Sequence, residues 1–121
     1  MGSDQDMNES VIEQTVYAEL QETAGAEFVV ELVNTFLEEA PGMLTALRNA
    51  RAQGDAELFR RSAHSLKSNG NTFGASRLAA MARELELAGL NADPARDVDA
   101  LAALDAEYAR AAAALKDLCR G

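Results

Sequence analysis

Residues Arg60 to Ala75 read RRSAHSLKSNGNTFGA, and as a helix this stretch separates polar from apolar side chains. With about 100° per residue and His64 at zero, the polar and small side chains fall within about 60° of the histidine. They are Glu57, Arg60, Arg61, Lys67, Ser68 and Asn71. The far side carries Leu58, Phe59, Leu66 and Phe73. The pattern therefore predicts an amphipathic helix that exposes the only histidine among 121 residues.

The segments before this stretch share its helical periodicity. A short amphipathic helix is expected around Val16 to Leu20, with Thr15 as its N-cap and Gly25 as its stop. A longer apolar stripe runs from Val29 to Leu47 at three- and four-residue spacing, with Pro41 inside it. Two interpretations are open there: a kink, or one helix ending before the proline and another starting with it. Because the stripe stays in phase, we favour a kinked or broken element that keeps one direction.

Turn and capping residues predict the remaining boundaries. Gly54 is expected to end the long segment and Asp55 to cap the His64 helix. Gly70 weakens that helix locally, and Gly74 ends it. The next helix is expected from about Leu78 to about Leu90.

A turn and a last helix complete the chain. Asn91 to Pro94 is the expected turn, with Asp93 as cap and the proline in the first helical turn. The last helix carries apolar residues from Leu101 to Leu118 at the alternating spacing of a bundle seam.

The sequence shows no strand alternation, no glycine-rich phosphate loop and no internal repeat. Four long amphipathic segments joined by short turns predict an all-α fold. The expected architecture is an antiparallel up-down four-helix bundle with a short additional N-terminal helix. Since all four stripes can close on one core, we expect a monomer.

Charge is unevenly distributed along this acidic chain, whose net charge is −9. Such a balance disfavours binding to nucleic acid or to an anionic membrane. Residues 55–83 nevertheless hold five basic and two acidic residues, a balance of +3, which leaves −12 for the remainder. A weakly positive island around His64 suits an anionic partner or a phosphoryl group, although a charge-mixed, solvated helix has the same composition.

Residues 1–10, MGSDQDMNES, are polar and lack the basic and apolar regions of a signal peptide. We expect a leader there, whose Met-Gly-Ser start is compatible with a recombinant origin, and one domain over 11–121. The single cysteine fits a reducing compartment, and no apolar run approaches membrane-spanning length. A cytoplasmic location is therefore expected.

Several site chemistries compete for His64. A metal site lacks partners, because there is no second histidine and the lone Cys119 lies far along the chain. A Ser–His–Asp or Cys–His hydrolase is not supported either, since no glycine-flanked nucleophile elbow occurs. An ordinary exposed histidine remains the competing interpretation.

The segment AHSLKSNGNTFGA resembles the signature of histidine-containing phosphotransfer (HPt) domains. His64 stands at the phosphoacceptor position and Lys67 at the lysine position, and Phe73-Gly74-Ala75 follow without a gap. Further sequence features that resemble those of the family occur along the chain in the same order as in the family. They are Leu20 with Gly25, the FLEEAP run Phe36 to Pro41, Gly54-Asp55 and Leu85-Glu86. The resemblance covers about Thr15 to Leu118, and departs from the family at Ser68, where glycine is commoner.

The resemblance assigns roles to the site residues. It makes His64 the nucleophile, with Lys67 offsetting charge on the arriving phosphoryl group. Glu86 is either a carboxylate that orients the imidazole or an ordinary exposed glutamate. Ser68 is small enough to let a partner approach. Arg61 is another candidate contact with the partner. Asn71 and Arg60 either contact the partner or face solvent, and we favour solvent for Arg60.

The expected function is a relay step in two-component signalling. A phosphoryl group would move from a phosphoaspartate of one receiver domain to His64 and on to an aspartate of another. Receivers belong to response regulators or a hybrid kinase, and magnesium is expected on the receiver, with no cofactor on this chain. The chain has no ATP-binding motif and lacks the H-E-x-x-x-P pattern of kinase dimerisation helices, because Ser65 follows His64. The alternative is a helical adaptor that binds a signalling partner without being phosphorylated.

Overall fold

The described residues of the computed structural model, 11–90 and 94–120, form five helices and no strand. The helices are α2 (Gln14–Ala24), α3 (Ala26–Gln53), α4 (Ala56–Phe73), α5 (Ser76–Ala88) and α6 (Pro94–Arg120). The prediction of an all-α fold is thus confirmed. The expected leader, residues 1–10, and the expected cap Asp93 lie outside the described residues.

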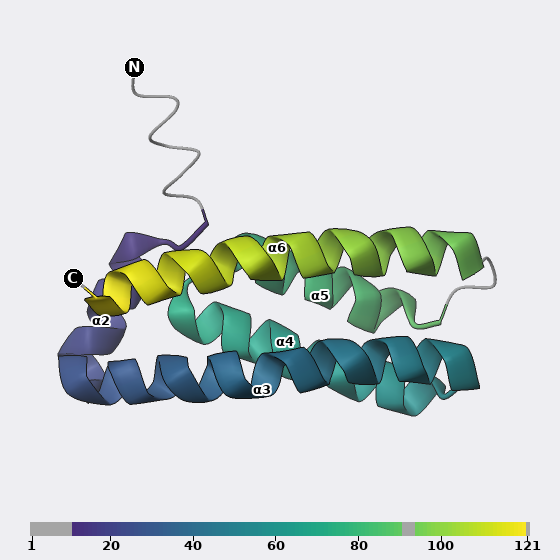
Figure 1. Ribbon diagram of the computed structural model, residues 1–121, viewed down its shortest axis with the longest axis horizontal. Helices are drawn as coiled ribbons and strands as arrows, with labels where there is room; N and C mark the ends of the chain where they lie inside the picture. Colours follow the sequence, from purple (N-terminus) through teal and green to yellow (C-terminus); the bar gives the residue numbers. More distant parts are fainter. Residues whose placement is uncertain (1–10, 91–93, 121) are drawn as a thin grey trace, which may run out of the picture.

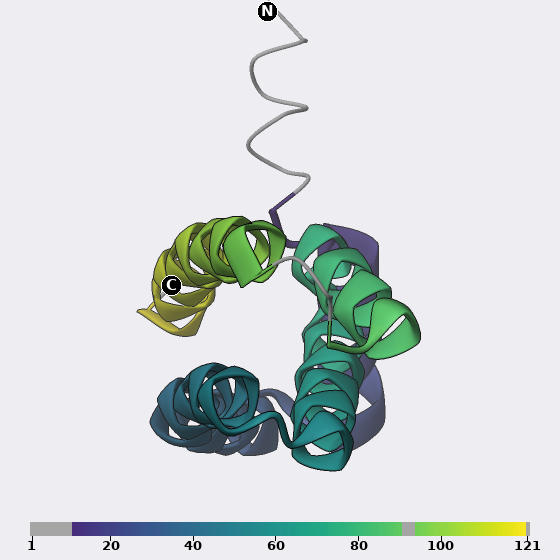
Figure 2. The ribbon, with the colours of Figure 1, turned by 90° about the vertical axis from the view of Figure 1, so that its right-hand side faces the viewer.

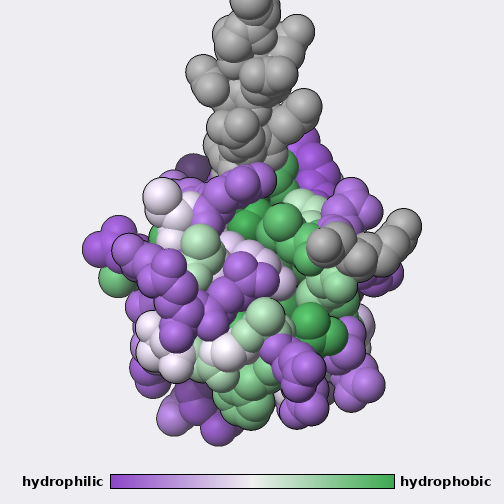
Figure 3. All heavy atoms as spheres, turned by 90° about the vertical axis from the view of Figure 1, so that its left-hand side faces the viewer, coloured by the Kyte–Doolittle hydropathy of each residue, from purple (hydrophilic) through white to green (hydrophobic). Residues whose placement is uncertain are grey.

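The four longer helices lie along the long axis of the molecule, and the chain reverses at each connection between them (Figure 1). Contacts join α3 to α4, α4 to α5, α5 to α6 and α6 back to α3, so these helices enclose a common interior (Figure 2). The short helix α2 packs against α3 and α4. At the end that carries α2, hydrophobic atoms reach the surface between polar ones (Figure 3).

The apolar stripes expected from the sequence meet in this interior. Its largest fully buried apolar side chains are Phe36, Phe59, Leu47, Leu66, Leu78, Leu104 and Leu115. The ring of Phe36 joins three helices, because its centroid lies 5.4 Å from that of Phe73 and 5.9 Å from that of Tyr108. Burying one such side chain contributes about 1.5–3 kcal/mol to the stability of the fold. The packing of these buried side chains therefore fixes how the helices sit against one another.

Pro41 does not divide α3. The helix is continuous over 28 residues. The interpretation in which one helix ends before the proline and another starts with it is therefore wrong, and the segment keeps one direction as expected. Proline has no N–H to donate to the carbonyl four residues earlier. Pro41 is exposed, so water can reach this turn, while Phe36, Ala40 and Leu44 keep the apolar face buried on both sides of it.

Most predicted caps occur where expected. Gly54 ends α3 and Gly74 ends α4, both in the left-handed conformation, with φ of 72° and 81°. The Asp55 side chain accepts a hydrogen bond from the Leu58 N–H at 3.0 Å, as an N-cap should. Helix α5 stops at Ala88, two residues before the predicted end, because the chain leaves the helix at the following glycine.

The prediction that Thr15 caps α2 is wrong, because the helix begins at Gln14, directly after Glu13. Tertiary contacts fix the chain at this point. The Glu13 N–H donates to the Gly74 carbonyl at 2.8 Å, and the Glu13 carboxylate accepts a hydrogen bond from the Ser76 hydroxyl. The start of α2 is therefore set by its attachment to the α4–α5 turn.

Gly70 permits a close approach of α4 to α5. A Cβ atom at this position would lie 3.2 Å from the Ala79 Cβ and 3.3 Å from the Ala75 carbonyl oxygen, tighter than ordinary packing. The sequence interpretation treated this glycine only as a local weakness of the helix. The structure gives it a packing reason, and the same close contact brings the next turns of α5 towards His64.

Candidate functional site

His64 projects from the middle of α4 into solvent. Its side chain is 56 % exposed, whereas Phe59 and Leu66 on the opposite side of the helix are fully buried. The amphipathic pattern of this helix therefore decides where the imidazole points: the apolar side must face the interior, and the histidine lies opposite to it.

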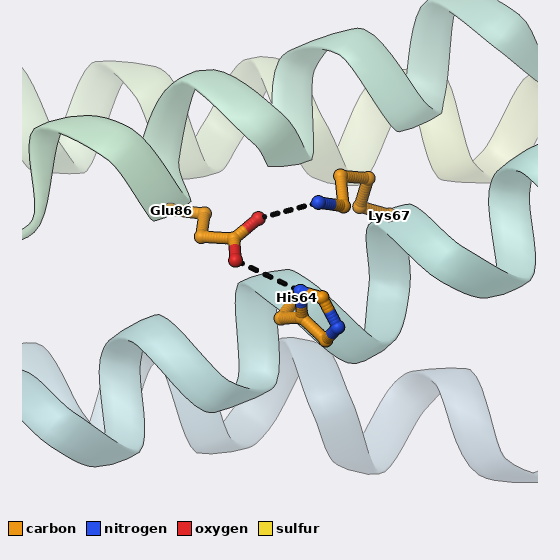
Figure 4. Close-up of polar contacts among 3 residues, drawn as sticks. All are labelled: His64, Lys67 and Glu86. Carbon is orange, nitrogen blue, oxygen red and sulfur yellow. Dashed lines mark hydrogen bonds and ion pairs between the residues drawn. The ribbon is translucent and has the colours of Figure 1, made fainter.

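The imidazole is held by a carboxylate from the neighbouring helix (Figure 4). The Nδ1 atom of His64 lies 2.8 Å from Oε2 of Glu86. The other oxygen of the same carboxylate, Oε1, lies 2.9 Å from Nζ of Lys67. One carboxylate on α5 thus binds two side chains that stand about one turn apart on α4.

The contacts with Lys67 and His64 keep the Glu86 carboxyl group ionised to a lower pH than usual. The Lys67 ammonium group and then the His64 ring lower the pKa of Glu86 from its ordinary value of 4.5, because both donate hydrogen bonds to the carboxylate. Glu86 is consequently an anion at neutral pH, and a carboxylate anion only accepts hydrogen bonds.

This contact determines the tautomer of the neutral imidazole. Since Glu86 can only accept, the proton of the ring sits on Nδ1, and Nε2 keeps its lone pair. Nε2 is the ring nitrogen that points away from both Glu86 and Lys67 in Figure 4. The site therefore presents one oriented nitrogen nucleophile to solvent.

The remaining predicted residues surround His64 without joining the carboxylate cluster. Ser68, Asn71, Arg60 and Arg61 are all exposed. The Ser68 carbonyl accepts a hydrogen bond from the Thr72 hydroxyl at 3.0 Å. Of the two open interpretations of Glu86, the structure shows a carboxylate in contact with the imidazole.

Among residues 11–90 and 94–120, no group of three or more histidine, cysteine or acidic side chains is arranged to hold a metal ion. None of the described helices is long and apolar enough to cross a membrane. Cys119 is a free thiol whose sulfur lies 3.8 Å from the Tyr17 hydroxyl, far along the chain from His64.

Comparison with known proteins gives two matches. The sequence pattern of the Hpt domain family matches residues 31–114. The crystal structure of histidine-containing phosphotransfer protein B (HptB) from Pseudomonas aeruginosa PAO1 is similar at 27 % sequence identity and a TM-score of 0.78, covering 91 % of this chain and 95 % of that one. No curated protein sequence matches the chain.

Proposed function

Because the chain belongs to the Hpt domain family, we propose that it accepts a phosphoryl group on His64 from a receiver phosphoaspartate and passes it to the aspartate of another receiver. The coarser role, histidine phosphotransfer in two-component signalling, follows from the family. The observation that carries the finer proposal is the exposed Nε2 of His64, whose ring is held at Nδ1 by Glu86 at 2.8 Å.

The transfer step uses the lone pair on Nε2. As this atom bonds to phosphorus, the P–O bond to the receiver aspartate breaks, and the aspartate leaves as a carboxylate. The imidazole ring gains positive charge, because Nδ1 still holds its proton. The Glu86 carboxylate stabilises that charge in place and keeps the ring oriented. The reverse sequence delivers the group to the next receiver.

Lys67 has two tasks in this mechanism. Its contact with Glu86 at 2.9 Å offsets a negative charge that would otherwise repel the incoming phosphoryl group. Lys67 also stands one helical turn from His64 on α4, so its ammonium group can turn to the oxygens of a phosphoryl group held there. A typical ion pair at a protein surface is worth about 0.2–1 kcal/mol, so we expect Lys67 to tune the rate rather than to enable the reaction.

The surroundings of His64 suit the approach of a protein partner. Ser68 is small and lies about 40° around the helix from the histidine, so it leaves room above the ring. Asn71, Arg61 and Arg60 flank the same face, and their exposed side chains can meet an acidic receiver surface. We take the four longer helices as an antiparallel up-down bundle that holds this face rigid.

The partners follow from the same chemistry. Hpt proteins are phosphotransfer carriers and not ATP-using enzymes, so a kinase must supply the phosphoryl group through a receiver domain. We place the magnesium ion on the receiver, with no cofactor on this chain, and we propose that the chain works as a cytoplasmic monomer. Analytical ultracentrifugation tests the monomer, for which a stable dimer is the contrary result.

Incubation with a phosphorylated receiver tests the function. The expected result is transfer of labelled phosphate to the chain, in an acid-labile and alkali-stable form, and no transfer to His64→Gln. The melting temperature of that variant should match the parent, since the side chain is exposed. Binding without transfer would support the adaptor alternative, and labelling of His64→Gln would overturn the assignment of His64.

A further inference from the structure

A concave surface lies between α5 and α6, on the side of α5 that faces away from His64. Helix α5 contacts α4 on one side and α6 on the other (Figure 2). Around the axis of α5, Met81 and Ala88 on this surface lie about 140–160° from Glu86, the residue that reaches His64. A ligand bound here therefore leaves the imidazole uncovered.

This surface, the α5–α6 groove, encloses a hollow of ≈ 290 Å³. Its floor is apolar, because Met81 and Leu85 of α5 pack against the core and leave part of their surface in the hollow. Ala100 and Ala103 form the α6 side. The hollow is thus lined by apolar side chains from both helices.

Small side chains have different effects on the two sides of α5. Towards α4, Gly70 and Ala79 let the helices close on each other, since a Cβ atom at position 70 would lie 3.2 Å from the Ala79 Cβ. Towards α6, Ala100 and Ala103 border an open hollow instead. The two alanines of α6 therefore make room for an apolar side chain of a ligand, whose burial there is favourable.

A pair of arginines lies at one end of the groove, over a buried carboxylate. The side chain of Glu107 on α6 is only 2 % exposed. Its Oε1 atom lies 3.7 Å from Nε of Arg77 on α5 and accepts a hydrogen bond from Arg110 on α6. The carboxylate thus draws together two guanidinium groups from different helices, and the three groups keep a net charge of +1.

The arginine pair keeps hydrogen-bond donors for a ligand. The side chains of Arg77 and Arg110 are 69 % and 60 % exposed, and a guanidinium group carries five N–H donors in a planar fork that matches a carboxylate. Because Glu107 already holds both groups in place, they lose less freedom when an anion binds. This end of the groove therefore suits an acidic side chain.

The other charged residues around the groove favour neither an anion nor a cation. Glu84 and Arg96 are exposed and carry opposite charges. Asp97 is buried and is held by α3, because its Oδ2 atom lies 3.1 Å from Nε of Arg51. The arginine pair therefore determines the charge that a ligand must carry.

The distance from the hollow to the arginine pair matches one face of a helix. Arg77 precedes Met81 by one helical turn, and Arg110 follows Ala103 by two. The pair consequently lies about 6–10 Å from the hollow along the helix axes. On a ligand helix, residues four and seven positions apart share a face and cover this distance.

We propose that the α5–α6 groove binds an amphipathic helix of a partner protein. An apolar side chain of that helix enters the hollow between Met81 and Ala103. An acidic residue four or seven positions away on the same helix meets Arg77 and Arg110. Such a contact is separate from phosphotransfer, and it can hold a partner while His64 exchanges its phosphoryl group.

A synthetic helix tests the proposal. The probe is a fluorescently labelled peptide of about 18 residues, long enough to form a helix, with one leucine and with glutamates four and seven positions after it. Fluorescence anisotropy should show saturable binding to the full chain at low ionic strength. A peptide with lysines in place of the glutamates should bind about tenfold more weakly. Equal binding of the two peptides, or no binding of either, would overturn the proposal.

Two leucine variants test the hollow. Ala103→Leu fills it, whereas Ala102→Leu makes the same change at the neighbouring exposed position, which does not line the groove. Leucine is nearly as good a helix former as alanine, so both variants should melt like the parent. Ala103→Leu should weaken binding of the glutamate peptide about tenfold, and Ala102→Leu should bind it like the parent. Parental binding by Ala103→Leu would contradict the groove.

The arginines give a second matched pair. Arg77→Gln and Arg83→Gln remove the same charge from exposed positions of α5, but only Arg77 lies beside Glu107. Arg110 remains in Arg77→Gln to pair with the buried carboxylate. Peptide binding should weaken several-fold in Arg77→Gln and stay parental in Arg83→Gln. Equal losses would indicate long-range charge alone and would overturn the arginine pair as the recognition element.

Peptide binding and phosphotransfer are measured separately, so the groove and the proposed function can fail independently. The anisotropy measurement needs no receiver domain. Transfer from a labelled receiver to His64 should run at the parental rate in Ala103→Leu, and also in the parent when it is saturated with the peptide. Slower transfer in either case would mean that the groove overlaps the receiver contact, and it would overturn the groove as a separate surface.

Discussion

Nδ1 of His64 lies 2.8 Å from Oε2 of Glu86, although 22 residues separate the two along the chain. The contact joins a reactive side chain on α4 to an orienting one on α5. It depends on the register between these helices, which the contact of Gly70 with Ala79 helps to fix.

Removing the carboxylate should release the ring. In Glu86→Ala the Nδ1 proton loses its acceptor, so the two neutral tautomers of His64 should become mixed. Transfer should slow roughly tenfold, the low end of the effect seen when the hydrogen-bond partner of a metal-bound histidine is removed. Glu86→Gln keeps an oxygen acceptor and should be milder. The ¹⁵N chemical shifts of the imidazole report the tautomer, and an unchanged tautomer in Glu86→Ala would contradict the orienting role.

Lys67 should control the pKa of Glu86. It is the largest cause of the lowered pKa, so Lys67→Ala should raise the pKa of Glu86 towards 4.5, whereas Lys67→Arg should largely preserve it. A ¹³C titration of the glutamate carboxyl groups measures both variants. The alanine variant should also transfer about two- to fivefold more slowly, the effect of losing a charge contact at a protein surface. An unchanged carboxyl pKa would show that the lysine does not act on Glu86.

The lowered pKa also predicts how stability depends on pH. A carboxyl group whose pKa is lower in the folded state stabilises the fold above its ordinary pKa, and that stabilisation is lost as the pH falls through the lowered value. The parent should therefore exceed Glu86→Gln in melting temperature at pH 7, and the difference should shrink below about pH 4.5. A difference that stays constant from pH 7 to pH 3 would exclude an ionised contact.

A bulky side chain at position 68 should block the partner without affecting the fold. Ser68 is exposed, and arginine is at least as good a helix former as serine, so Ser68→Arg should melt like the parent. It should slow receiver transfer, because the partner must bring phosphorus within about 3–3.5 Å of Nε2. Ser68→Gly is the matched small variant and should transfer normally. Parental transfer by Ser68→Arg would mean that the receiver does not cover this position.

Gly74 should be essential to the attachment of α2. Its φ of +81° disfavours any side chain, and a Cβ atom would lie 2.8 Å from the Glu13 carbonyl oxygen. Gly54 provides the control, since its φ is similar at +72° and a Cβ atom there meets nothing within 4 Å. The backbone strain common to both is about 1–3 kcal/mol. Urea denaturation should show a larger loss for Gly74→Ala than for Gly54→Ala, and equal losses would mean that the Glu13 contact contributes nothing.

Local sequence determined which side of each helix is buried and where most helices end. In α4 the apolar residues Phe59 and Leu66 recur at helical spacing, so the position of His64 on the exposed face could be predicted without a structure. Asp55 and Gly74 mark the ends of that helix through short-range hydrogen bonding and backbone preference. These features depend on residues within a few positions of one another, which a single sequence displays directly.

Tertiary structure decided what His64 and Lys67 touch. The sequence left Glu86 open between an orienting carboxylate and an ordinary exposed glutamate, and it did not pair the lysine with it. It also favoured a cap at Thr15 that the attachment of Glu13 to Gly74 displaces. Periodicity describes the faces of one helix, but the register between two helices results from the packing of many side chains, here around Gly70 and Ala79. That register brings Glu86 to His64.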